Sequence, residues 1–111
     1  DLSKIAGASL LNANNETGII TSHIQCALLS SKQRPLLFLD WIAGWGKAEL
    51  SKAWEFDYLA ITGHKLGAPA GSAALIYRKS APLMPLIPGN AQNGLRAGTE
   101  NVLSAYALGV V

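Results

Sequence analysis

Two short apolar runs, each ending in polar residues, constrain the fold of this 111-residue chain more than any other feature. The first run covers 36–39 (LLFL) and ends at Asp40; the second covers 57–61 (DYLAI) and is followed by 62–65 (TGHK). Short runs that are apolar on both faces are typical of strands in a parallel sheet. We therefore expect two central strands with both faces covered.

The other segments extend these strands into an alternating pattern. Apolar spacing, capping residues and turn residues predict a strand at 8–11, a helix capped at Thr21-Ser22 and running through Leu29, a short helix within 41–56, a strand at 72–78, a loop at 81–98, and a final helix capped by Thr99 with Glu100 and Asn101 in its first turn. Alternation of this kind predicts an α/β fold with a mainly parallel sheet.

Polar residues gather where three of the predicted strands end. These residues are 14–16 (NNE), Asp40, and 62–65 (TGHK). In open α/β sheets, ligands bind outside the carboxyl ends of the strands. The sequence therefore predicts a ligand site at this edge.

Composition excludes several other classes of function. Half of the residues are hydrophobic, 14% are charged, and the net charge is +2 without a basic cluster, so no nucleic-acid partner is expected. No apolar stretch is long enough to span a membrane, and the first residues lack the pattern of a signal peptide. The single cysteine, Cys26, cannot form an internal disulfide, which favours a reducing, cytoplasmic setting.

The polar residues at the predicted edge match the needs of pyridoxal phosphate. This cofactor requires a lysine for its aldehyde, a carboxylate for its ring nitrogen and donors for its phosphate. Lys65, Asp40, and the pair Thr62 and His64 can supply these groups. Taken singly, each also has a plain structural explanation: Asp40 as a turn residue, Lys65 as a solvated side chain, and His64 as a hydrogen-bonded ring.

Three motifs resemble those of cysteine desulfurases, within class V of the aminotransferase superfamily. They lie at 14–18 (NNETG), at 57–78 around His64-Lys65, and at 88–101 (PGNAQNGLRAGTEN). The resemblance spans nearly the whole chain but only a central part of the family's longer fold. It implies that 1–111 form part of the large domain of a fold-type-I enzyme, a partial three-layer sandwich with a mainly parallel sheet.

The same resemblance implies a role for each candidate residue. Lys65 would form the Schiff base with pyridoxal phosphate and act in catalysis, and Asp40 would pair with the pyridine nitrogen. Thr62 and His64 would bind the phosphate. Asn15 would lie near the ring's O3′, and Thr99 would reach the phosphate of a neighbouring subunit in a homodimer. No metal site is expected.

The chain also departs from the family's pattern. Ala43 stands where the family has a glutamine that hydrogen-bonds O3′, while Trp41 and Trp45 add bulk. The family's ring-stacking histidine and nucleophilic cysteine fall outside the matching segments. We interpret Cys26 as a small buried hydrophobic residue rather than as that nucleophile.

These matches and departures leave three interpretations. The first is a segment of a cysteine desulfurase, inactive alone, from an enzyme that converts L-cysteine to L-alanine. That enzyme would pass persulfide sulfur to an acceptor protein for iron–sulfur or thio-cofactor assembly. The second is a non-catalytic remnant that serves dimerisation or interaction. The third is another class V pyridoxal-phosphate aminotransferase or lyase.

Overall fold

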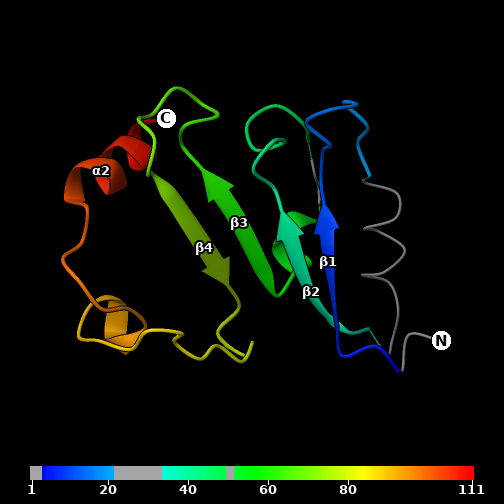
Figure 1. Ribbon diagram of the computed structural model, residues 1–111. Helices are drawn as coiled ribbons and strands as arrows, with labels where there is room; N and C mark the ends of the chain where they lie inside the picture. Colours follow the sequence, from blue (N-terminus) through cyan, green and yellow to red (C-terminus); the bar gives the residue numbers. More distant parts are fainter. Residues whose placement is uncertain (1–3, 22–33, 50–51) are drawn as a thin grey trace.

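Four strands form one sheet in the computed structural model, which describes residues 4–21, 34–49 and 52–111. The strands lie in the order β1 (Gly7–Leu11), β2 (Leu36–Asp40), β3 (Tyr58–Thr62) and β4 (Ala73–Tyr77) (Figure 1). The first three are parallel, and β4 runs antiparallel to β3. The predicted α/β fold with a mainly parallel sheet is confirmed.

The helical elements in the described part of the chain are short. They are the 3-10 helices η2 (Ala53–Glu55) and η3 (Gln92–Gly94) and the α-helix α2 (Val102–Val110). Figure 1 shows α2 beside the start of β4, at the end of the sheet where β1, β2 and β3 finish. Apart from Thr21, the predicted helix through Leu29 lies outside the described residues, and so does Cys26.

The capping of the last helix differs from the prediction. Asn101, not Thr99, is the N-cap: its side-chain oxygen accepts a hydrogen bond from the Ser104 backbone N–H at 3.1 Å. Thr99 and Glu100 therefore precede the helix rather than begin it. Both threonine and asparagine are good caps, so sequence preference alone does not select between these positions.

The register of the strands divides their side chains between two faces. Leu39 pairs with Leu59, and Leu59 pairs with Ile76, so alternate residues of neighbouring strands lie on one face. That face carries the core, which consists of Leu37, Leu39, Trp41, Ala53, Phe56, Leu59 and Ile61, with Ala8, Leu10, Trp45, Ala74 and Ile76 packed against it. We call it the core face.

The opposite face, here called the open face, is less covered than predicted. Its residues include Leu36, Leu75 and Tyr77, whose exposed fractions are 40%, 46% and 41%. Of these three residues, only Leu36 belongs to the runs at 36–39 and 57–61, so the expectation that these runs are covered on both faces is wrong at Leu36. An apolar run indicates which residues can be buried. It does not indicate whether this chain supplies the side chains that would cover the open face of the sheet.

The tryptophans that depart from the family's pattern pack on the core face. Trp41 is 7% exposed, and its ring meets that of Trp45 edge-on with centroids 4.8 Å apart. Because Trp41 follows Asp40 directly, its side chain lies on the other side of the sheet. The bulk expected near the site therefore falls in the core.

A buried amide beside Trp41 requires the glycine at position 44. Asn12 is fully buried, and neither its amide nor Trp41 Nε1 has a hydrogen-bond partner among the described residues. A Cβ built on Gly44 would lie 1.8 Å from Asn12 Oδ1 and 3.0 Å from Trp41 Cδ1. Any side chain at position 44 therefore overlaps the buried amide.

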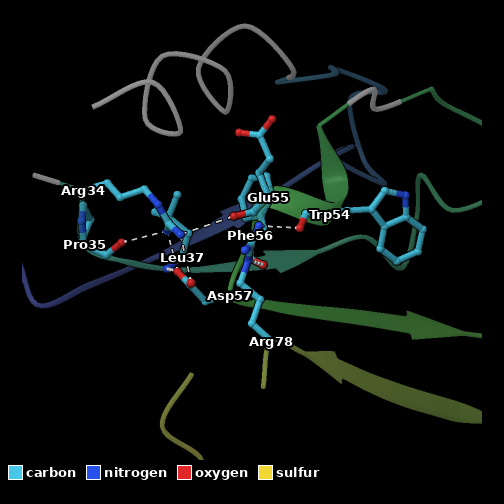
Figure 2. A network of polar contacts seen from close by, with 8 residues as sticks. All are labelled: Arg34, Pro35, Leu37, Trp54, Glu55, Phe56, Asp57 and Arg78. Carbon is cyan, nitrogen blue, oxygen red and sulfur yellow. Dashed lines mark hydrogen bonds and ion pairs between the residues drawn. The ribbon is translucent and has the colours of Figure 1, made fainter. Parts of the chain in front are cut away.

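Asp57 forms several hydrogen bonds at the end of the sheet where β2 and β3 begin (Figure 2). Its carboxylate accepts hydrogen bonds from Arg34 at 2.6 and 3.0 Å and from the Leu37 backbone N–H at 2.8 Å. Burial acts to raise the pKa of Asp57, but the bonds from Arg34 and Leu37 outweigh it and hold this pKa below its ordinary value. Arg78 adds bonds to the Phe56 and Trp54 carbonyls.

The close approach of Gly44 and Asn12 generates a first prediction. Gly44→Ala should lower the free energy of unfolding by about 1–3 kcal/mol, because the added carbon overlaps a packed side chain. Combining it with Asn12→Ala should recover part of that loss, with a coupling energy of about 1 kcal/mol. Denaturant unfolding of the two single variants and the double variant measures this energy.

Gly109 provides the matched control for that cycle. A Cβ at this position in α2 meets nothing within 4 Å. Gly109→Ala should therefore stabilise the chain by about 1 kcal/mol, the helix preference for alanine. Strict additivity of Gly44→Ala and Asn12→Ala would contradict the proposed overlap.

The lowered pKa of Asp57 generates a second prediction. Its stabilising contribution is fully present above the unfolded-state pKa of about 3.9 and is lost as the pH falls through the lower folded-state value. The free energy of unfolding should therefore drop with pH below about 4. Asp57→Asn should flatten this dependence and cost about 1–3 kcal/mol at neutral pH.

Arg34→Met separates the ion pair from other acid effects. Without the guanidinium, the folded-state pKa of Asp57 should move back toward its unfolded-state value, so the loss of stability below about pH 4 should become shallower. Urea unfolding at a series of pH values measures both variants. An unchanged pH dependence in Asp57→Asn would show that other carboxylates govern acid unfolding.

Candidate functional site

Two predicted site residues share one face at the carboxyl edge of the parallel strands. Asp40 pairs with Leu11 of β1 and with Ala60 of β3, and Thr62 lies two residues beyond Ala60. Because alternate residues share a face, Asp40 and Thr62 both lie on the open face. Strand spacing and rise place their backbones about 8 Å apart, within reach of one small ligand.

Asp40 combines a turn role with a free oxygen. Its Oδ1 accepts the Ile42 backbone N–H at 3.0 Å, which turns the chain away from β2. Oδ2 has no hydrogen-bond partner among the described residues, and the side chain is half-buried. The structural explanation for Asp40 is therefore correct without excluding a second role, because one carboxylate oxygen remains for a cationic donor.

Thr62 and His64 are joined by a hydrogen bond. The Thr62 hydroxyl is 2.7 Å from His64 Nδ1 and donates to the Ser72 carbonyl at 2.8 Å. Thr62 is 3% exposed, whereas His64 is exposed. The chain thus keeps the hydroxyl inside and directs the ring toward solvent.

Lys65 lies in the tight turn that follows β3. The Leu66 and Ala68 N–H groups both donate to the Gly63 carbonyl, at 2.8 and 3.0 Å. A Cβ at Gly63 would lie 2.6 Å from Ser72 Oγ, so this close approach admits only glycine. Lys65 itself is exposed and forms no ion pair within the described part of the chain. Its amine is available to a ligand.

The NNETG turn assigns different roles to its two asparagines. Asn14 Oδ1 accepts the backbone N–H groups of Glu16 and Thr17, at 2.9 and 3.0 Å, and Gly18 completes the turn with a φ of 72°. Asn15 is exposed and donates to Glu16 Oε1 at 3.2 Å. Asn14 therefore builds the turn, and Asn15 is the asparagine available to a ligand.

Thr99 is not joined to the other candidates. It is exposed in the segment before α2, and no hydrogen bond in the described ranges links it to Asn15, Asp40, His64 or Lys65. Nearby Arg96 and Glu100, which could pair, form no ion pair there either. The structure thus places Asp40, Thr62, His64 and Lys65 at the carboxyl ends of β2 and β3, and Thr99 in the exposed segment before α2.

Sequence reasoning missed two residues that shape this edge. The role of Asn14 has a local signal, because asparagine with a glycine four residues on is typical of a side-chain-supported turn. Ser72 has no such signal. Its carbonyl accepts a hydrogen bond from the Thr62 hydroxyl, and its own hydroxyl donates to the Pro69 carbonyl at 2.8 Å. Backbone acceptors ten residues away leave no mark in a sequence.

A cavity of about 470 Å³ lies over β4 and the following loop, lined by Leu75, Tyr77, Met84 and Arg96 among others, and neither Asp40 nor Lys65 lines it. Within the described ranges, no group of three or more metal-ligating side chains occurs. No helix there is long and apolar enough to cross a membrane.

Comparisons with known proteins agree with this fold and these motifs. A cysteine desulfurase of Gluconacetobacter diazotrophicus is 41% identical over 109 residues, which cover 96% of this chain and 27% of that protein. Cysteine desulfurase 2 of Trichormus variabilis is 40% identical over 103 residues, covering 91% of this chain and 26% of that protein. The chain therefore spans about a quarter of the length of these relatives.

Solved structures give the same result. A NifS-like protein from Rickettsia africae superposes with a TM-score of 0.82 at 33% identity, over 94% of this chain and 29% of that one. DndA from Streptomyces lividans superposes with a TM-score of 0.80 at 32% identity, over 96% and 32%. Residues 3–111 also match the family model for aminotransferase class-V. The chain belongs to the aminotransferase class-V family.

Proposed function

We propose that this chain is the segment of a pyridoxal-phosphate-dependent cysteine desulfurase that holds the cofactor. The observation that carries the proposal is the position of Asp40 and Thr62 on one face at the carboxyl edge, with His64 and Lys65 in the turn directly after β3. Ligands of open α/β sheets bind at such edges. Relatives named cysteine desulfurases support the choice of reaction.

The donors on this edge fit the cofactor. Pyridoxal phosphate supplies an electron sink for a substrate amine, and the protein supplies binding and orientation. Lys65 offers an exposed amine for the cofactor aldehyde, and the free Oδ2 of Asp40 can hold a protonated ring nitrogen. His64 offers its exposed ring to the phosphate, and Thr62 holds that ring through the hydrogen bond between them. Asn15 offers its exposed amide.

One difference limits how tightly the ring is held. Ala43 has no donor where the family has a glutamine that hydrogen-bonds O3′ of the cofactor. The side chains of Trp41 and Trp45 pack in the core and supply no substitute for that donor. We propose that Thr99 of a second copy completes the phosphate site, as the resemblance to cysteine desulfurases implies. Within one chain, Thr99 is exposed in the segment before α2. The assembled site would then belong to a homodimer.

The substrate of the whole enzyme would be L-cysteine, and its products would be L-alanine and persulfide sulfur for an acceptor protein. Iron–sulfur or thio-cofactor assembly in the cytoplasm would use that sulfur. This reaction needs a nucleophilic cysteine, and the only cysteine in these 111 residues is Cys26, which lies outside the described residues. We expect the 111 residues alone to release no alanine from cysteine.

A second candidate function is a non-catalytic interaction module. The exposed apolar side chains favour it: Leu103 and Tyr106 of α2 are 82% and 74% exposed, and Leu75 of the open face is 46% exposed. A module of this kind would associate with a partner but would not select Lys65 for reaction. Covalent trapping of the cofactor therefore distinguishes the two candidates.

The proposed role of Lys65 generates a third prediction. Incubation with pyridoxal phosphate followed by borohydride should fix the cofactor on Lys65 in preference to the other five lysines, because Lys65 follows the proposed phosphate ligand His64 at the same edge of the sheet as Asp40. Peptide mass spectrometry locates the adduct. Lys65→Ala should abolish the preferred adduct.

Lys79→Ala is the matched control, because this lysine follows β4 at the opposite edge of the sheet. It should leave labelling of Lys65 unchanged. Asp40→Asn should reduce that labelling about tenfold, the effect of losing about 1.4 kcal/mol of binding free energy. Equal labelling of all exposed lysines, unaffected by Asp40→Asn, would refute the cofactor site.

A further inference from the structure

The hydroxyl of Thr62 has one hydrogen but two partners. It lies 2.8 Å from the Ser72 carbonyl oxygen and 2.7 Å from His64 Nδ1. A carbonyl oxygen has no hydrogen to give, so the bond to Ser72 uses the hydroxyl hydrogen. The bond to His64 must then run the other way, with Nδ1–H donating to Thr62 Oγ1.

We propose that Thr62 is a positioning residue that fixes the tautomer of His64. With its hydrogen committed to Ser72, Thr62 accepts only an imidazole that carries a proton on Nδ1. The neutral ring therefore presents Nε2 to solvent as an unprotonated acceptor. The ring presents an Nε2–H donor only when it is doubly protonated.

The surroundings hold this arrangement in place. Thr62 and Ser72 are 3% and 1% exposed, and the Ser72 hydroxyl donates to the Pro69 carbonyl at 2.8 Å. A Cβ at Gly63 would lie 2.6 Å from Ser72 Oγ and 2.7 Å from the Ala68 Cβ, so the chain between Thr62 and His64 is closely packed. The Ser72 carbonyl also accepts the Gly63 backbone N–H at 2.9 Å, which holds it beside the Thr62 hydroxyl.

A fixed tautomer determines what His64 offers a ligand at the carboxyl edge. An anion such as a phosphate is held by Nε2 only in the doubly protonated ring, whereas a ligand hydroxyl or ammonium can donate to the neutral ring. Thr62 thus acts on a ligand through His64, since its own hydrogen is already bonded. The relevance of this tautomer to a cofactor rests on the proposed function, but the tautomer itself does not.

Nitrogen-15 NMR of the histidine rings tests the proposal on the chain without any cofactor. Long-range nitrogen–proton correlation at alkaline pH distinguishes the two neutral tautomers, and His23→Gln assigns the remaining signal to His64. We expect the Nδ1–H form to exceed the Nε2–H form roughly fivefold, a ratio within the net strength of one hydrogen bond. A dominant Nε2–H form would overturn the proposal.

Three variants separate positioning from general support of the fold. Thr62→Val keeps the shape but removes the hydroxyl, so the Nε2–H form should become dominant, while Thr62→Ser should restore the Nδ1–H form. Ser72→Ala removes a buried hydroxyl from the same turn but keeps the acceptor carbonyl, so the tautomer should not change. A loss of the Nδ1–H form in Ser72→Ala equal to that in Thr62→Val would refute a specific role for Thr62.

The outcomes remain separate from those for the cofactor site. If borohydride labelling of Lys65 fails but His64 keeps its Nδ1–H form, the proposed function fails and the role of Thr62 stands. If Lys65 is labelled but His64 is an Nε2–H tautomer, the cofactor site stands and the positioning role fails. The wild-type spectrum decides the second question even if Thr62→Val does not fold.

Discussion

The buried carboxylate of Asp57 is the interaction on which the arrangement of the strands depends. Its side chain bonds Arg34 and the Leu37 N–H, its own N–H donates to the Leu37 carbonyl at 3.0 Å, and its carbonyl accepts the Arg78 N–H at 2.9 Å. One residue therefore joins the start of β2, the start of β3 and the end of β4. Leu37 and Asp57 meet one residue before the first β2–β3 pair, so this contact sets the register that later brings Asp40 beside Ala60.

β3 begins directly after the charged residue Asp57 and ends at the candidate site residue Thr62. Thr62 lies five residues after Asp57, which corresponds to about 16 Å along a strand. That distance is about twice the Debye length of about 8 Å at physiological ionic strength. A charge change at the carboxyl edge, such as binding of an anion beside Lys65, is therefore well separated along β3 from the ion pair that orders the sheet.

Much of the fold follows from local patterns, and much of the site does not. The runs at 36–39 and 57–61 locate β2 and β3 to within one residue, because a short apolar run between polar segments has few alternatives to a strand. Topology then places Asp40 and Thr62 at one edge. The helix cap at Asn101 escaped prediction because threonine and asparagine are both good caps. The covering of the open face escaped prediction because it depends on neighbours distant in sequence. The direction of the Thr62–His64 bond escaped for the same reason, since it is set by a backbone carbonyl at position 72.

The overlap between position 44 and the Asn12 amide also constrains how this sequence can diverge. Two residues 32 positions apart share one volume, so a substitution at one changes what the other tolerates. Replacement of Asn12 by a smaller residue opens that volume first, and only then can position 44 gain a side chain at low cost. The reverse order passes through an overpacked intermediate. Substitutions that replace Gly44 are therefore expected to follow a substitution at position 12. The identity of residue 12 determines which side chains position 44 can accept.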